Sequence, residues 1–208
     1  MLNIVVALSA EAEPIVRHFG LVPRNGAARF KTYGNDEIPV RLVVSGAGRK
    51  LAAMAAAFLG EKSGASNQTA WLNVGIAGQR NLPVGTPVLA DRITDDTTES
   101  SWYPPIPFQP FCKTFPVRTV DQPVSDYPTD DVYDMEASGF YGAASRMSNP
   151  GTVHVLKVIS DNRLTRVESI SRNGVIRLME DRMGGIERIV TSLMELTVNE
   201  EETAENED

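Results

Sequence analysis

Residues 130–140 read DDVYDMEASGF, which places Asp134, Met135 and Glu136 side by side. The Val-Tyr pair before them favours a short strand, and the alanine-rich segment after them favours a helix. A junction of this kind is where open α/β sheets usually place their ligands. Met135 offers an apolar surface, and the two carboxylates can accept protons from hydroxyl groups, a combination that suits a sugar ring. A helix-capping carboxylate beside a core methionine explains the same residues, so the rest of the chain must decide between the two interpretations.

Apolar runs on both sides of this stretch predict the strands of a sheet. Residues 2–8 (LNIVVAL) and 152–160 (TVHVLKVIS) are nearly continuous apolar runs, as expected of strands that are buried on both faces. The other expected elements are strands at 28–33, 38–44, 70–74, 84–93 and 115–120, and helices at 9–20, 49–61, 137–147 and 169–196, the last interrupted at Gly184-Gly185. Strands that alternate with helices predict a single α/β domain with a central mixed β-sheet flanked by helices.

Residues with useful chemistry stand at the ends of these expected strands. Glu11 opens the helix after the first strand, where Ser9 is the expected N-cap, although a surface acid there would also favour the helix dipole. Ser45-Gly46-Ala47-Gly48 precedes the next helix and is a candidate cradle for an anion or a hydroxyl group. Gly75-Ile76-Ala77-Gly78 lets the backbone approach a ligand closely. Ser160-Asp161 ends the long apolar strand near the C-terminus.

Length and composition are those of one globular domain. The chain has 208 residues, of which 42% are hydrophobic and 23% are charged. No apolar run approaches the length that spans a bilayer, and residues 1–3 lead straight into a strand, so neither a membrane segment nor a signal peptide is expected. The single cysteine, Cys112, excludes an internal disulfide and fits the cytoplasm. His18 and His154 lack metal-ligand spacing, and no metal site is expected.

The net charge of −7 is concentrated at one end of the chain. Six acidic residues lie within the last nine, so the rest of the chain is close to neutral. We therefore divide the chain into a domain at residues 1–198 and an acidic, disordered tail at residues 199–208. The near-neutral body has no basic patch, which argues against a nucleic-acid partner.

Six short segments occur in a characteristic order: ALSAEA, VSGAGRKLAA, LNVGIAG, PVGTPVLAD, YDMEA and VISDN. Each is unspecific alone, but the ordered set resembles the nucleoside phosphorylase/nucleosidase superfamily. Within it, the chain is most similar to the methylthioadenosine/S-adenosylhomocysteine nucleosidases. The resemblance extends from Met1 to about Leu196 and is weak between Thr97 and Asp130. It implies a nucleoside phosphorylase-like fold, hydrolysis of the N-glycosidic bond of an adenine-type purine ribonucleoside, no metal or organic cofactor, and a homodimer or larger homo-oligomer.

The resemblance also implies roles for particular residues. Glu11 matches the glutamate that activates water, and Asp161, with Ser160 beside it, matches the aspartate that protonates the purine leaving group. Met135 and Glu136 match the residues that pack under the ribose and bind its hydroxyls. The remaining substrate-binding candidates are Ser45, Gly46, Gly75, Ile76, Ala77, Gly78, Gln122 and Asp134, of which those at 75, 77 and 78 match the family's Gly-rich cradle.

This chemistry agrees with what paired carboxylates can do. Cleavage of an N-ribosidic bond passes through an oxocarbenium-like state, which needs a protonated leaving group and a stabilised sugar cation. Carboxylates on opposite sides of the sugar meet both needs, as they do in inverting glycoside hydrolases. We therefore expect Glu11, Glu136 and Asp161 to line one pocket at the C-terminal edge of the sheet, with Met135 against its floor.

Several positions depart from the family pattern. The phosphorylases hold phosphate with arginines that have no clear counterpart here, and Arg49 is the nearest candidate, so hydrolysis is favoured over phosphorolysis. Ile76 replaces a serine of the nucleosidases. The base-binding segment is shortened to residues 121–129, in which Gln122 and Tyr127 are candidate substitutes.

Three functions therefore stay open from the sequence. They are a hydrolytic nucleosidase, a nucleoside phosphorylase, and a nucleoside-binding protein that has lost turnover. The prolines and aromatic residues of the loop at 102–111 indicate a contact between subunits that also closes a neighbour's pocket.

Overall fold

The structure, a computed structural model, describes the backbone of residues 1–24 and 29–205 and the side chains of residues 1–24 and 29–197. Its helices are α1 (Ser9–His18), α2 (Arg49–Ser63), α3 (Ala137–Ala144), α4 (Arg172–Glu180) and α5 (Met183–Glu205), with short 3-10 turns at Pro150–Thr152 and Val167–Ser169. Its strands are β1 (Leu2–Val6), β2 (Val22–Pro23), β3 (Lys31–Gly34), β4 (Val40–Val44), β5 (Ala70–Gly78), β6 (Pro87–Asp95), β7 (Ser101–Trp102), β8 (Lys113–Thr119), β9 (Val132–Asp134) and β10 (Val153–Asp161).

The strands form one mixed sheet around β5, which pairs in parallel with β1 on one side and with β10 on the other. From β1 the sheet continues through parallel β4 to the predicted β3–β4 hairpin. From β10 it continues through antiparallel β6 and parallel β8 to β9. The pairing of Gly78 with Tyr133 then joins β5 to β9. The predicted mixed sheet is present, but this pairing closes five of its strands into a barrel, which the prediction of a central sheet flanked by helices did not include.

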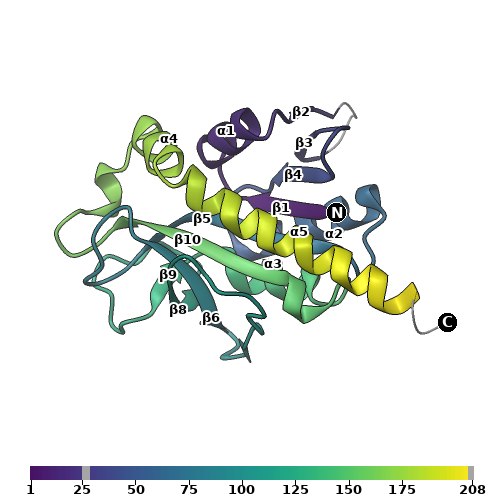
Figure 1. Ribbon diagram of the computed structural model, residues 1–208. Coiled ribbons are helices and arrows are strands. Elements are labelled where there is room, and N and C mark those ends of the chain that lie inside the picture. Colours follow the sequence, from purple (N-terminus) through teal and green to yellow (C-terminus); the bar gives the residue numbers. More distant parts are fainter. Residues whose placement is uncertain (25–28, 206–208) are drawn as a thin grey trace.

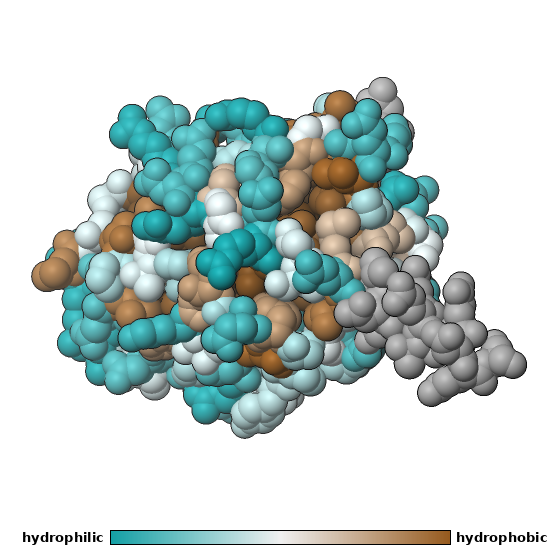
Figure 2. Space-filling view, viewed as in Figure 1, coloured by the Kyte–Doolittle hydropathy of each residue, from teal (hydrophilic) through white to brown (hydrophobic). Residues whose placement is uncertain are grey.

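Helices cover the sheet from two sides and divide the core into two layers. Helices α1, α4 and α5 pack on one face, and α2 and α3 pack on the other (Figure 1). Side chains of β5 alternate between the layers, with Leu72 and Val74 in the first and Trp71 in the second. On the side that α5 occupies, hydrophilic residues predominate and hydrophobic ones are scattered among them (Figure 2).

Several element boundaries differ from the sequence-based expectation, and three of the differences have a local cause or change an assignment. β5 continues to Gly78 because its Gly-rich end is still paired with β10, rather than forming a separate turn. Ser9 is the first residue of α1 and Leu8 is the N-cap, because the Glu11 carboxylate accepts the Leu8 N–H. The break in the last helical region falls before Met183, and Gly184-Gly185 lies inside α5.

The expected acidic tail overlaps the end of α5, which includes residues 199–205, and residues 206–208 lie outside the described part of the chain. The domain boundary at residue 198 therefore stays a prediction. Among the described residues, no helix is both long and apolar enough to cross a membrane.

The aromatic loop at 102–111 packs largely onto its own chain. The Trp102 ring lies 6.3 Å from the Tyr141 ring of α3, and the Phe108 ring lies 5.1 Å from the His154 ring of β10. Tyr103, in contrast, is 70% exposed. Within this loop, Tyr103 is thus the aromatic residue that remains largely exposed.

Candidate active site

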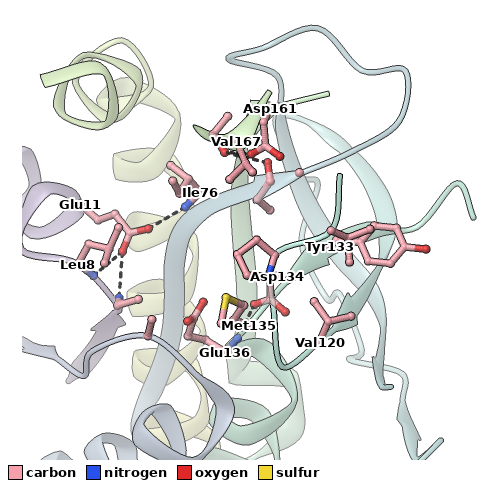
Figure 3. A pocket seen from close by; sticks show the side chains of 17 residues that line it. Leu8, Glu11, Ile76, Val120, Tyr133, Asp134, Met135, Glu136, Asp161 and Val167 are labelled. Carbon is pink, nitrogen blue, oxygen red and sulfur yellow. Dashed lines mark hydrogen bonds between the residues drawn. The ribbon is translucent and has the colours of Figure 1, made fainter. Parts of the chain in front are cut away.

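A cavity of about 220 Å³ lies at the edge of the sheet where β1, β5, β9 and β10 end. The parallel strands β1, β5 and β10 bring their carboxyl ends to one edge, and the antiparallel pairing of β9 with β5 adds the end of β9. In Figure 3, Glu11, Glu136 and Asp161 approach the cavity from different sides, with Met135 between the last two. The predicted residues that line the cavity are Glu11, Ile76, Ala77, Gly78, Asp134, Met135, Glu136, Ser160 and Asp161.

Glu11 is fixed by three backbone N–H groups. Its Oε2 accepts hydrogen bonds from Ala7 (3.0 Å) and Leu8 (2.8 Å), and its Oε1 accepts one from Ile76 (2.9 Å). The carboxylate is 2% exposed, and this burial raises the pKa of Glu11, outweighing the opposite effect of the hydrogen bonds. A Cβ at Gly75 would stand 2.8 Å from Oε1, so a larger residue there would displace the Glu11 carboxylate. Gly75 therefore makes room for Glu11 and does not itself line the cavity.

The Gly-rich turn at 45–48 holds Glu136 and lines the cavity with Ala47, whereas the predicted Ser45 and Gly46 are absent from the lining. Gly48 N–H, at the start of α2, donates to Glu136 Oε1 at 2.8 Å. The Ser45 hydroxyl is buried and donates to the Gly46 carbonyl at 2.7 Å. Desolvation raises the pKa of Glu136 to about 7, with nearby Asp134 and Glu11 adding to the rise and Lys157 opposing it.

Asp134 has partners on both carboxylate oxygens. Oδ1 accepts from the Thr119 hydroxyl (2.7 Å), and Oδ2 accepts from the backbone N–H groups of Glu136 (3.1 Å) and Ala137 (2.8 Å). Oδ2 also lies 2.8 Å from Lys157 Nζ. Asp134 borders the cavity, but its carboxylate binds the first backbone N–H groups of α3 and pairs with Lys157. This arrangement agrees with the helix-capping interpretation of the stretch.

Lys157 is a component of the site that the sequence reasoning missed. Its side chain is 1% exposed at the centre of β10. Burial lowers the pKa of Lys157, but the stronger combined effect of Asp134, Glu136 and Glu11 raises it, so the ammonium stays charged among three acidic side chains. A lysine inside an otherwise apolar buried strand requires a carboxylate partner, and this signal was present in TVHVLKVIS.

Asp161 ends β10 on another side of the cavity and is 4% exposed. Its Oδ1 accepts the Ser160 hydroxyl at 2.5 Å, and its Oδ2 accepts the Tyr127 hydroxyl. Ser160 Oγ also lies 3.2 Å from the Ala77 carbonyl of β5. Both oxygens of the expected acid are therefore held by hydroxyl groups.

The remaining wall of the cavity is apolar and includes part of the shortened segment at 121–129. Pro123 and Val124 line the cavity, whereas Gln122 is exposed and Tyr127 lies behind Asp161. The neighbouring Asp121 is held outward by an ion pair of 2.6 Å with Arg49. The expectation that Gln122 contacts a base does not fit this geometry. The other apolar lining residues that the sequence reasoning missed are Ala7, Leu8, Val120, Tyr133 and Val167.

Arg49, the nearest candidate for holding phosphate, is already occupied. Its guanidinium pairs with Asp95 and Asp121 and donates to the Thr97 hydroxyl at 2.7 Å, and its side chain is 14% exposed. Burial favours neutral Asp95, but the hydrogen bonds from Arg49 and its neighbours prevail and lower the pKa of Asp95 to about 2. In the described part of the chain, no cluster of three His, Cys, Asp or Glu side chains suits a metal ion.

No protein-family model matches the sequence, and no curated protein matches it. Solved structures match its fold. The apo 5'-methylthioadenosine nucleosidase of Arabidopsis thaliana aligns with a TM-score of 0.72 at 16% identity, covering 92% of this chain and 95% of that one. The methylthioadenosine/S-adenosylhomocysteine nucleosidase of S. pneumoniae aligns at 0.65 and 20% identity, covering 93% and 97%. The futalosine hydrolase of Helicobacter pylori aligns at 0.69 and 14% identity, covering 92% and 97%.

These alignments define the class of fold, because the chain shares the architecture of these solved structures over more than nine-tenths of its length. The matching structures are more particularly those of nucleosidases and of a futalosine hydrolase. At 14–20% identity the likeness extends to the fold, and the activity must be argued from the site.

Proposed function

We propose that this protein hydrolyses the N-glycosidic bond of an adenine-type purine ribonucleoside, releasing the free base and the ribose moiety. The observation that carries the proposal is the single cavity in which buried Glu11 and Asp161 approach from different sides, with Met135 and Glu136 also in its lining. The matching S. pneumoniae nucleosidase was crystallised with a transition-state inhibitor and with 8-aminoadenine, which supports a nucleoside as ligand.

Glu11 is suited to act as the general base. Its Oε1 accepts one backbone hydrogen bond and so retains a lone pair for a water molecule. Burial raises the pKa of Glu11, which brings its proton affinity closer to that needed at neutral pH. In the proposed step, the water oxygen bonds to the anomeric carbon and Glu11 takes the proton that the water loses.

The other two groups stabilise the sugar and the leaving base. Gly48 occupies one oxygen of Glu136, which leaves the other to accept a ribose hydroxyl, while the apolar Met135 side chain packs against the ring. As the bond from the anomeric carbon to the base breaks, its electron pair passes into the purine, and Asp161 donates a proton to a ring nitrogen. The sum is addition of one water across the N-glycosidic bond, and each group of this kind contributes on the order of a hundredfold in rate.

The contacts that Arg49 already makes favour hydrolysis over phosphorolysis. Its contacts with Asp95, Asp121 and Thr97 leave no free guanidinium edge for a phosphate near the cavity.

We place the reaction in the cytoplasm and assign the protein to a homodimer or larger homo-oligomer, with exposed Tyr103 in the contact. Light scattering of the wild-type protein and of Tyr103→Ser checks the assembly, because loss of this ring should weaken the contact.

The activity is tested by incubating the protein with a panel of purine nucleosides that differ in base and 5′ substituent, with and without phosphate. Chromatography should show free adenine-type base and a ribose product, at a rate that phosphate does not change. Ribose 1-phosphate among the products would replace hydrolysis by phosphorolysis. Binding of nucleosides without any release of base would assign the fold to a binding protein.

A further inference from the structure

Tyr127 reaches the candidate acid from the shortened segment between β8 and β9. Its hydroxyl donates to Asp161 Oδ2, and its ring is 1% exposed. Burial and the carboxylate of Asp161 both raise the pKa of the Tyr127 phenol, so the hydroxyl keeps its proton and acts as a donor. Tyr127 is absent from the cavity lining; its ring packs 5.9 Å from the Tyr133 ring, and its hydroxyl reaches the lining residue Asp161.

The backbone at Tyr127 adopts a conformation that a tyrosine rarely takes. Its φ of 45° lies in the left-handed region, where the side chain crowds the backbone. Arg80, just beyond the end of β5, holds this conformation: Nε donates to the Tyr127 carbonyl at 3.0 Å and Nη2 to the Pro128 carbonyl at 3.2 Å. The strain therefore persists because neighbouring groups outweigh it, as is common where a backbone serves a site.

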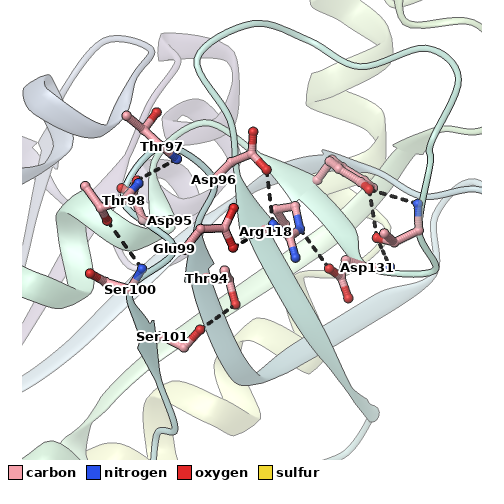
Figure 4. A network of polar contacts seen from close by, with 12 residues as sticks. Thr94, Asp95, Asp96, Thr97, Thr98, Glu99, Ser100, Ser101, Arg118 and Asp131 are labelled. Carbon is pink, nitrogen blue, oxygen red and sulfur yellow. Dashed lines mark hydrogen bonds and ion pairs between the residues drawn. The ribbon is translucent and has the colours of Figure 1, made fainter.

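Both ends of the segment are anchored by ion pairs. At its start, Asp121 pairs with Arg49 at 2.6 Å. Beyond its end, Asp131 accepts from Arg118 Nε at 3.0 Å, and Arg118 also pairs with Asp96 at 3.1 Å (Figure 4). Because the segment is short and held on both sides, it can place the Tyr127 hydroxyl at one defined position.

Strand β5, which pairs with β10, leaves space for the Tyr127 hydroxyl at Gly78. A Cβ at Gly78 of β5 would stand 2.6 Å from Asp161 Oδ2 and 2.8 Å from Tyr127 Oη. Any larger residue would have to displace one of the two side chains. Gly78 is thus required for the contact, independently of the strain at Tyr127.

We propose that Tyr127 is the positioning residue for Asp161, supplied by the segment that replaces the longer base-binding region. The terminal torsion of an aspartate is broad, so a carboxyl group held on one side can turn away from a ligand. Ser160 holds Oδ1 and Tyr127 holds Oδ2, and together they keep the carboxyl plane facing the leaving base. This role rests on the proposed nucleosidase function.

Tyr127→Phe tests the role, because it keeps the buried ring and removes the hydroxyl alone. The variant is compared with the wild type on a purine nucleoside and on a 4-nitrophenyl riboside, whose leaving group departs as a stable anion without a proton. For the purine substrate, kcat should fall on the order of tenfold while KM changes little. For the nitrophenyl substrate, kcat should stay within about twofold, because no acid is needed.

Tyr141→Phe is the matched control, since it removes another buried tyrosine hydroxyl that lies outside the site. Arg80→Met removes the two hydrogen bonds to the backbone carbonyls of Tyr127 and Pro128, and the Arg80 side chain is partly exposed. This variant should reproduce the selective effect if Tyr127→Phe does not fold. Equal slowing of both substrates, or no slowing of the purine, would overturn the role of Tyr127 while leaving the nucleosidase intact. A wild-type protein that releases no base from any purine nucleoside would overturn the proposed function and this role together.

Discussion

Glu136 should lower the free energy of unfolding of the wild-type protein as the pH rises. Glu136→Gln should abolish this decrease. Burial raises the pKa of Glu136 from 4.5 to about 7, so between these values the folded protein holds a proton that the unfolded chain has released. The favourable contribution is fully present below pH 4.5 and is lost as the pH rises through 7. At about 1.4 kcal/mol per pH unit, the loss amounts to about 3 kcal/mol of unfolding free energy.

The wild-type curve alone does not reveal this effect, because His154 works in the opposite direction. Burial lowers the pKa of His154 from 6.5 to about 4, so its contribution to stability is present above 6.5 and is lost as the pH falls toward 4. Between pH 4.5 and 6.5 the two slopes largely cancel. The informative quantity is therefore the difference in unfolding free energy between Glu136→Gln and the wild type, in which the His154 contribution drops out.

Urea unfolding at several values between pH 4.5 and 8 measures this difference. It should shift in favour of the variant by about 3 kcal/mol over that range. Glu61→Gln, which removes an exposed carboxylate, is the control for loss of a charge at the surface. A difference for Glu136→Gln that does not change with pH would refute the conclusion that Glu136 is forced toward neutrality by its surroundings.

Three further outcomes are expected. Asp161→Asn should retain the fold and melting temperature while base release, followed by chromatography, falls roughly a hundredfold or more; wild-type activity would contradict the assignment of the acid. Glu11→Gln should abolish hydrolysis but leave binding of a nucleoside, measured by calorimetry, nearly unchanged, because it removes the base for water and keeps the hydrogen-bonding shape. Deleting residues 199–208 should leave melting temperature and activity nearly unchanged, and a large loss of either would show that this segment contributes to the fold.

The sequence was sufficient to predict which residues stand at the ends of strands. Apolar runs that stop shortly before Glu11 and at Asp161 predicted the positions of these two acids, because β1 and β10 are parallel to β5 and bring their carboxyl ends to one edge. Glu136 follows β9, which runs antiparallel to β5 and reaches the same cavity through closure of the barrel. The same reasoning failed for Gln122, because whether a loop residue points inward depends on distant anchors, in this case the pairing of Asp121 with Arg49.

Tertiary structure alone decided how those residues are supported. Closure of the barrel depends on the pairing of Gly78 with Tyr133, which requires the sheet to curl and leaves no periodic signal in either segment. The ion pair of Lys157 with Asp134 and the hydrogen bond of Tyr127 to Asp161 join residues more than twenty positions apart. Local patterns determine strand, helix and turn because these depend on neighbouring residues. The partner of a buried polar group is selected only when the packed core brings distant segments together and excludes the water that would otherwise satisfy it.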